Sequence, residues 1–235
     1  MMRSSRPLLR RVSLACLLIA ALLAAPVAAW FVRPTIFFSA SFDISGAPGS
    51  SLPQAEVGQF EVPTPPEVFQ VVPSPTQGGE LKISDQGTVV EELLAGQFKK
   101  KFVGQELFFG LEIKALQTTT DLVVNLLDDS DSGMIDVSFG GDGMIRIGGK
   151  PVAPYVAGTV YDIGMNLHDP IAGAEFWTAT VTTSAGSLWT QSGPLLLTGP
   201  LTVRSVEIVR PAGSSAGEFR VDDMIALSYK LSFGL

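Results

Sequence analysis

Two neighbouring carboxylates, Asp222 and Asp223, lie in the stretch GEFRVDDMIALSY near the end of the chain. Side chains of a β-strand alternate between two faces, so Asp223 would share its face with the apolar Phe219, Val221 and Ile225. An unpaired buried carboxylate is costly or becomes neutral. We therefore expect Asp223 to meet a cation or protein donors, or to lie at the surface. A catalytic role is disfavoured because no base or nucleophile accompanies the pair, and a β-bulge is a further alternative.

Other patterns for nucleophilic or metal chemistry are incomplete. Residues 213–217 match G-x-S-x-G, but a nucleophile elbow needs a following helix and a later histidine, whereas the only histidine, His168, lies upstream. One histidine without cysteine partners does not build a zinc site. The paired carboxylates of jelly-roll glucanases, E-x-D-x-E or E-x-D-x-x-E, are missing. In the acidic turn over 127–133, Asp129 and Asp131 could ligate calcium, but a solvated turn is favoured.

Four aromatic side chains are candidates for a platform on which a sugar ring stacks, namely Trp189, Tyr155, Trp177 and Tyr161. Such rings bind neutral glycans with little charge. Tyr161 and Trp177 fall on expected strands, where a position between two sheets is equally natural. Trp189 and Tyr155 are therefore the better candidates for ligand contacts.

The first residues of the chain predict an export signal. Four arginines precede an apolar run that ends in small residues, and residues 1–29 therefore read as a signal peptide or, if uncleaved, an N-terminal membrane anchor helix. Residues 30–235 are expected to be one exported domain, secreted, periplasmic or attached to the cell envelope. The only contact with a membrane would be through the uncleaved N-terminal segment.

Charge and cysteine content narrow the classes of partner. The single cysteine, Cys16, lies in the leader, so the exported domain has no disulfide. Removing the leader takes four of the 16 basic residues and leaves 12 against 23 acidic ones, a net charge of −11. This charge argues against nucleic acid and anionic membranes, and it is compatible with divalent cations or neutral glycans.

Short alternating segments separated by Gly, Pro and Ser turns predict an all-β fold with about eleven to thirteen strands. The Pro-rich stretch over 47–79 has room only for a short edge strand near 68–72. The segment 140–143 predicts a hairpin turn. The best helical candidate, 89–102, is interrupted by Gly96.

The order of these segments resembles the concanavalin A-like (laminin G-like) jelly-roll domains of exported bacterial proteins. The resemblance rests on an early strand ending in Phe42-Asp43, a G-x-L-x-I strand at 79–83, a hairpin at 135–147, a G-T-x-Y-x-I-x-L strand at 158–167 and a final F-x-x-D-D-I-x-L at 219–227. It implies an antiparallel two-sheet sandwich. It also implies a structural Ca²⁺ held by Asp43 and by Asp222 or Asp223, with the final segment as a terminal edge strand.

Related jelly rolls include lectins, glycosidases, lyases and structural modules, so the fold alone does not assign an activity. The missing catalytic patterns favour a non-catalytic module that binds carbohydrate or mediates adhesion at the cell envelope. A glycoside hydrolase or lyase that processes polysaccharides is the first alternative. A purely structural envelope module is the second.

Overall fold

The computed structural model describes residues 31–42, 55–61, 68–74, 78–85, 91–169, 175–195, 197 and 199–232. Residues 35–228 form one compact unit, and the described part of a second unit comprises 31–34 and 229–232. No helix within the described ranges is long and apolar enough to span a membrane. The predicted leader over 1–29 lies outside the described residues, so cleavage and export stay predictions.

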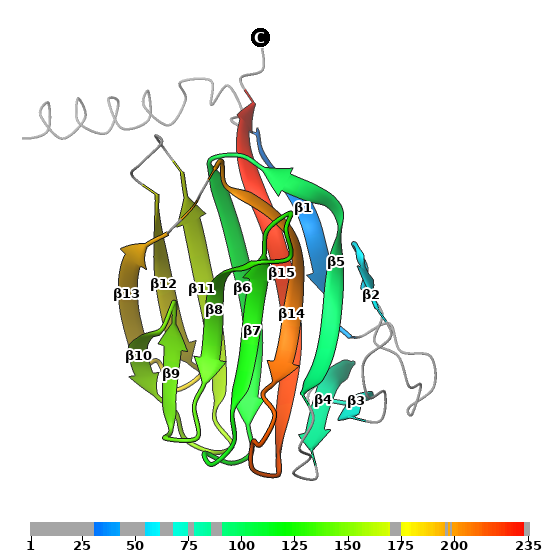
Figure 1. Cartoon of the computed structure of the whole chain (residues 1–235), viewed down its shortest axis with the longest axis vertical. Helices are drawn as coiled ribbons and strands as arrows, with labels where there is room; N and C mark the ends of the chain where they lie inside the picture. Colours follow the sequence, from blue (N-terminus) through cyan, green and yellow to red (C-terminus); the bar gives the residue numbers. More distant parts are fainter. Residues whose placement is uncertain are drawn as a thin grey trace, which may run out of the picture. The chain divides into compact units, whose positions relative to one another are not determined.

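Fifteen strands are present in the described residues, and they form two antiparallel sheets (Figure 1). In the eight-stranded sheet, β1 pairs with β15 and the other strands follow the order β13 (Leu188–Pro194), β12 (Phe176–Thr183), β11 (Val160–His168), β6 (Glu106–Ala115), β15 (Gly217–Ser232), β4 (Gly79–Asp85), β3 (Phe69–Pro73), with β1 at Phe31–Ala40. The seven-stranded sheet follows the order β10 (Lys150–Pro154), β9 (Met144–Ile147), β8 (Gly133–Phe139), β7 (Leu122–Leu127), β14 (Thr202–Arg210), β5 (Glu92–Val103), β2 (Gln59–Phe60). The predicted all-β, two-sheet architecture is confirmed.

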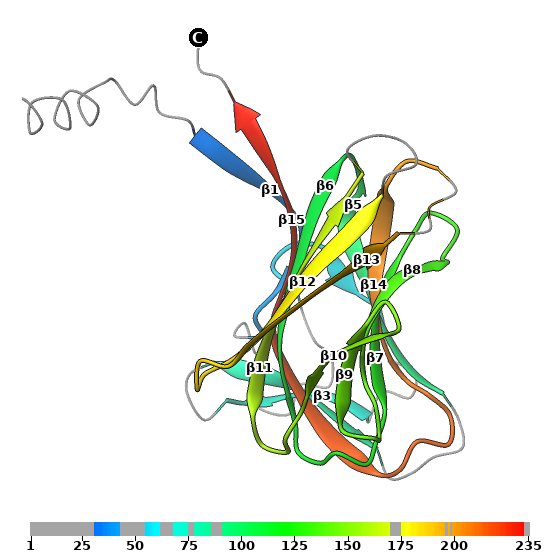
Figure 2. The same cartoon turned by 90° about the vertical axis from the view of Figure 1, so that its left-hand side faces the viewer.

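The core lies between the two sheets, which face each other in the view of Figure 2. β11 shows how the sequence produces this arrangement, because Tyr161, Ile163 and Met165 are buried while the residues between them face outward. The Phe139 ring of the seven-stranded sheet lies 6.5 Å from the Tyr161 ring and 5.9 Å from the Phe219 ring. Aromatic side chains therefore join the sheets across the core.

The segment 89–102, the best helical candidate, is largely β5, so the helical alternative was wrong. β5 pairs with β14 on one side and β2 on the other. A Cβ on Gly96 would lie 2.9 Å from the Phe38 ring and 3.0 Å from Val206. Gly96 therefore allows a close approach between the sheets, and this packing outweighs the local helical preference.

The strands at the ends of each sheet are short or contain proline. β3 was predicted as a short edge strand and is confirmed as one, and it ends in Pro73. β13 ends in Pro194, and the Ser192 carbonyl accepts a hydrogen bond of 3.0 Å from Lys150 Nζ. β10 begins at Lys150 and contains two prolines, whereas β2 has two residues. Proline lacks the N–H that a further strand would need.

Candidate functional site

The Asp222–Asp223 pair lies at a β-bulge in the middle of β15. Asp222 is opposite Glu112, after which the register shifts and resumes with Ile225 opposite Gly110. Asp223 is the extra residue and adopts a left-handed backbone, with φ 47°. Met224 is consequently buried, in the position that strict alternation would give to Asp223. The predicted single apolar face through this segment was wrong, because the bulge reverses the alternation.

Neither carboxylate points into the core. Asp222 is half-buried and accepts a hydrogen bond of 2.9 Å from the Asp223 N–H, and Asp223 is exposed. The prediction of an edge strand was also wrong, since β15 lies between β6 and β4. Two carboxylates fall short of the six to eight oxygens that calcium takes, and Asp43, the third predicted ligand, lies outside the described residues. Calcium binding at this position stays a prediction.

The carboxylates of the acidic turn after β7 interact with backbone N–H groups and basic side chains of the protein. Asp128 accepts hydrogen bonds from the N–H groups of Ser130 and Ser132, which lower the pKa of its carboxyl. Lys101 Nζ lies 2.6 Å from Asp129, and Arg204 lies 3.5 Å from Asp131. Across the described ranges, no three His, Cys, Asp or Glu side chains are arranged to hold a metal ion.

The G-x-S-x-G match at 213–217, for which a hairpin turn was expected, lies in the turn that leads from β14 to β15. These strands belong to different sheets, so the turn connects the two sheets and is not a hairpin. The Ser214 hydroxyl donates to the Pro211 carbonyl at 2.7 Å, so it serves the turn. The buried Arg210 stabilises the same turn. Its guanidinium donates to the Ser215 carbonyl at 2.9 Å and to the Thr120 hydroxyl at 2.6 Å. His168 stacks on Phe176 with 4.5 Å between ring centroids.

Three of the four predicted platform aromatics are buried, which favours the alternative of a core position. Tyr155 donates its hydroxyl to the Gly140 carbonyl at 2.8 Å, and burial, with Asp121 and Asp142 adding to it, raises its pKa to about 12. Tyr161 and Trp177 are each 2% exposed. Trp189 is half-buried on β13 and packs against the core from the edge of its sheet.

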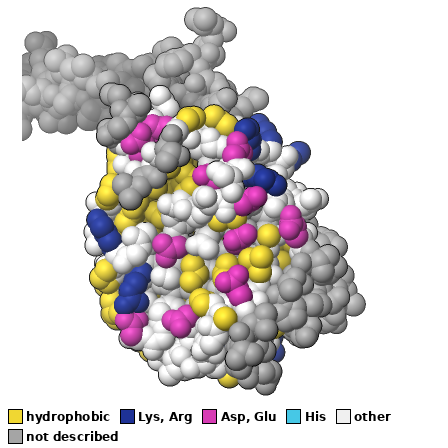
Figure 3. All heavy atoms as spheres, viewed as in Figure 1, with side chains coloured by type: hydrophobic (Ala, Val, Ile, Leu, Met, Phe, Trp, Pro, Cys, Tyr) yellow, Lys and Arg dark blue, Asp and Glu magenta, His cyan; other side chains and the backbone are white. Residues whose placement is uncertain are grey.

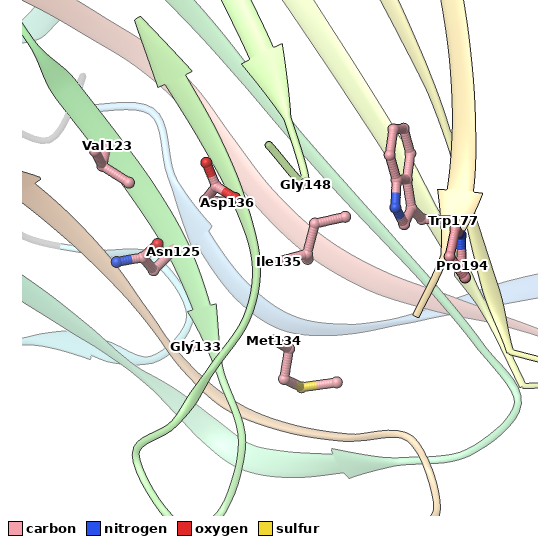
Figure 4. A pocket seen from close by; sticks show the side chains of 9 residues that line it. All are labelled: Val123, Asn125, Gly133, Met134, Ile135, Asp136, Gly148, Trp177 and Pro194. Atoms are coloured by element: carbon pink, nitrogen blue, oxygen red, sulfur yellow. The ribbon is translucent and has the colours of Figure 1, made fainter. Parts of the chain in front are cut away.

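A pocket of about 390 Å³, called the front pocket here, opens on the outer side of the seven-stranded sheet. It is lined by Val123, Asn125, Gly133, Met134, Ile135, Asp136, Gly148, Trp177 and Pro194. Figure 4 shows Trp177 and Pro194 on one side, Val123 and Asn125 on the other, and Asp136 between them. A neighbouring hollow of about 370 Å³ shares Gly133 and Met134 with it, so the two hollows adjoin at these residues.

A row of three polar residues crosses the sheet at this pocket. Glu207 is opposite Asn125, and Asn125 is opposite Asp136. Burial raises the pKa of Glu207, and Asp131, Glu91 and Glu61 add to the effect. Acidic side chains are spread over this face, whereas Lys and Arg gather near its margins (Figure 3). The row was not predicted, because its members are far apart in sequence and only the strand order brings them together.

The front pocket offers hydrogen-bond acceptors, amide donors and apolar surface. Asn125 and Asp136 supply the polar groups, while Met134, Pro194 and the edge of Trp177 supply the apolar wall. Among the described residues that line it there is no Lys, Arg, His or Tyr. The pocket therefore suits recognition of a hydroxyl-rich neutral molecule better than neutralisation of an acidic one.

No protein-family model and no curated protein matches the chain. Solved structures do resemble it. An alginate lyase from Aplysia kurodai is 8% identical with a TM-score of 0.58, over 83% of this chain and 99% of the lyase. Peanut lectin is 9% identical with a TM-score of 0.53, over 85% of this chain and 100% of the lectin. A sialidase is 15% identical with a TM-score of 0.50 over 68% of this chain, which spans 17% of that enzyme.

At these identities the likeness establishes the fold and not the activity. The strand pattern, the two sheets and these structures agree with the resemblance seen in the sequence. The chain therefore has the concanavalin A-like jelly-roll sandwich fold.

Proposed function

We propose that the domain binds a neutral glycan in the front pocket and does so without catalysis. The observation that carries this proposal is the lining of the pocket, where Asn125 and Asp136 lie beside the apolar surface of Met134 and Pro194. Sugar hydroxyls donate to carboxylates and exchange hydrogen bonds with amides, while the C–H faces of the ring contact apolar side chains. The lectin and the lyase of similar fold support a carbohydrate ligand in general terms.

The charge of this face favours neutral over acidic polysaccharides. Glu207 and Asp136 flank Asn125, and none of the described residues that line the pocket is a Lys or Arg. On the Trp177 side, the Nζ of Lys150 lies 5.8 Å from the Trp177 ring centroid and donates to the Ser192 carbonyl. The adjoining hollow at Met134 lengthens the recess, which suits a chain of several sugar units better than one.

Binding should be measured by calorimetry against neutral oligosaccharides and an alginate oligosaccharide. We expect a neutral ligand to bind, and we expect Asp136→Asn and Asn125→Ala each to weaken it about 10-fold by removing one hydrogen bond at a charged or amide group. Glu106→Gln is the matched control, since Glu106 is exposed on the other sheet. Binding of alginate alone, or of no glycan on an array, would refute the proposal.

Glycoside hydrolysis is the second candidate, favoured by the raised pKa of Glu207. Glu207 and Asp136 lie two strands apart, which places their backbones about 10 Å from each other. This is just above the about 6.5–9.5 Å that separates the carboxyl groups of inverting glycosidases. Release of reducing ends that disappears in Glu207→Gln would establish this activity. Binding without release would leave the non-catalytic function standing.

A further inference from the structure

A second recess, called the back groove here, lies on the outer side of the eight-stranded sheet and has a volume of about 310 Å³. Its principal residues are Phe108, Gly110, Glu112, Asp162, Gly164 and Asp223. The strand register explains why the back groove forms at this position. Gly110 of β6 lies opposite Gly164 of β11 on one side, and opposite Ile225 of β15 on the other. Two neighbouring strands therefore lack a side chain at the same level of the sheet.

The Phe108 ring lies in the space that the two glycines leave. A Cβ on Gly110 would be 3.0 Å from Phe108 Cε1, and one on Gly164 would be 3.2 Å from Phe108 Cε2. The ring therefore extends over both glycines along the surface of the sheet. Phe108 is half-buried, so part of an aromatic surface remains accessible beside the groove.

Carboxylates of three adjacent strands lie side by side at one end of the groove. Glu112 is opposite Asp162 on one side and Asp222 on the other, and Asp223 also lines the groove. Like charges directly opposite each other in a sheet are destabilising. Among the side chains that the structure describes, neither Glu112 nor Asp162 forms an ion pair with Lys, Arg or His.

The basic groups of this face form no ion pair with Glu112 or Asp162 among the described side chains. Lys114 lies two residues from Glu112 along β6, opposite Val160 and Arg220. Arg220 pairs with Glu80 at 3.0 Å and also with Glu218. The pKa of Glu112 is raised by its burial and, beyond that, by Asp162, Asp223 and Glu80. The fold thus keeps a repulsive arrangement that packing alone does not require.

We propose that the back groove binds a ligand that carries a protonated amino group on a sugar ring. The ammonium would lie between Glu112 and Asp162 and relieve their repulsion. The accessible part of Phe108 offers an apolar and cation-attracting surface to the ring. Thr180 and Thr182, which also line the groove, offer hydroxyls to the hydroxyls of the sugar.

Calorimetry with glucosamine oligomers tests the proposal, with the N-acetylated oligomers and a trilysine peptide as comparisons. We expect the glucosamine oligomers to bind and the uncharged, N-acetylated ones not to bind. Asp162→Asn should weaken binding about 3-fold, and Glu112→Gln combined with Asp162→Asn about 10-fold, as for partly exposed ion pairs. Raising the salt concentration to about 0.5 M should weaken it further.

Glu106→Gln is the matched control, because Glu106 is on the same strand and the same side of the sheet but outside the groove. It should leave the affinity for glucosamine oligomers unchanged. An equal loss in Glu106→Gln, or equal binding of trilysine, would overturn the proposal by showing attraction to acidic surface alone. Neutral-glycan binding measured on the same variants reports on the front pocket, so the two proposals fail separately.

A stability measurement separates a binding role from a structural one. If the carboxylates serve a ligand, Asp162→Asn removes repulsion and should raise the melting temperature while it weakens binding. A lower melting temperature in Asp162→Asn would show that the carboxylate supports the fold, and it would overturn the assignment.

Discussion

At two places in the molecule an aromatic ring packs against two glycines, and the exposure of the ring differs between them. Trp177 lies against Gly148 and Gly193, and Phe108 lies over Gly110 and Gly164. The Trp177 ring is buried and 2% exposed, whereas Phe108 is half-buried at the surface. At Trp177, the absence of side chains on the glycines allows close packing against a buried ring. At Phe108, it leaves a recess beside a half-buried ring. The same sequence feature therefore supports the core at one site and borders an accessible recess at the other.

The spacing of the carboxylates also differs between the sheet that faces the front pocket and the sheet that faces the back groove. On the seven-stranded sheet the amide of Asn125 separates Glu207 from Asp136. On the eight-stranded sheet Asp162, Glu112 and Asp222 are consecutive across the strands. Separated carboxylates suit hydrogen bonding to neutral hydroxyls, whereas consecutive ones attract a cation.

The largest effect is expected for Gly193→Ala. Its Cβ would lie 2.8 Å from the Trp177 ring, which is held inside the sandwich, and the resulting overpacking should cost about 2 kcal/mol of unfolding free energy. Gly164→Ala meets a ring that is free to move outward, so its cost should stay below about 0.5 kcal/mol. Urea denaturation of both variants measures the difference.

Gly199→Ala serves as the control for this pair, because nothing lies within 4 Å of a Cβ at Gly199. Equal losses in Gly193→Ala and Gly164→Ala would contradict the comparison, since they would mean that both rings are equally fixed.

Asn125→Asp would place three carboxylates side by side on the seven-stranded sheet, at 207, 125 and 136. This row would resemble the row of Asp162, Glu112 and Asp222 on the eight-stranded sheet. Three consecutive carboxylates should lower the unfolding free energy at neutral pH by about 1 kcal/mol. The loss should vanish in acid, where the carboxylates are neutral. Denaturation at two pH values measures it, and Asn125→Ser shows how much comes from losing the amide. A loss that persists in acid would mean that charge is not the cause.

The smallest effect is expected for Glu112→Gln, which removes the charge of the middle residue in the row Asp162, Glu112 and Asp222. The folded state raises the pKa of Glu112 above its ordinary value of 4.5. This residue therefore lowers stability as the pH rises from that value through the raised pKa. Glu112→Gln should match the parent protein in acid and exceed it by about 0.5 kcal/mol, or about 1–2 °C in melting temperature, above that range.

Melting curves measured across this pH range test the sign as well as the size. The acidic groups that raise the pKa of Glu112 are Asp162, Asp223 and Glu80, and Asp222 lies opposite it on β15. All four are unchanged in the variant. A melting temperature that falls in Glu112→Gln at neutral pH would contradict the repulsion described for this row.

The sequence predicted the architecture because alternation and turn residues are local signals. The strand that contains Tyr161, the hairpin at 140–143 and the short strand ending in Pro73 all form where expected. The prediction failed for 89–102, where pairing on both sides of β5 decides the conformation, and at Asp223, where the bulge shifts the register. Both depend on strands that are distant in sequence.

The candidate sites were harder to predict than the fold. Aromatic residue type pointed to Tyr155, Tyr161 and Trp177, which are buried. Asn125 and Glu112 carry no local signal, since each acquires its neighbours only when distant strands pair. Residue type alone did not distinguish an aromatic in the core from one beside a groove, because that depends on which strands flank it.

The proline residues of the edge strands have a consequence for behaviour at high concentration. An open strand edge invites a second molecule to add its own strand, which leads to aggregation. β3 and β13 end in Pro73 and Pro194, β10 contains two prolines, and the Ser192 carbonyl is already occupied by Lys150. The ends of both sheets are thus poor templates for further strands, so the domain should resist aggregation although 46% of the residues in the full chain are hydrophobic.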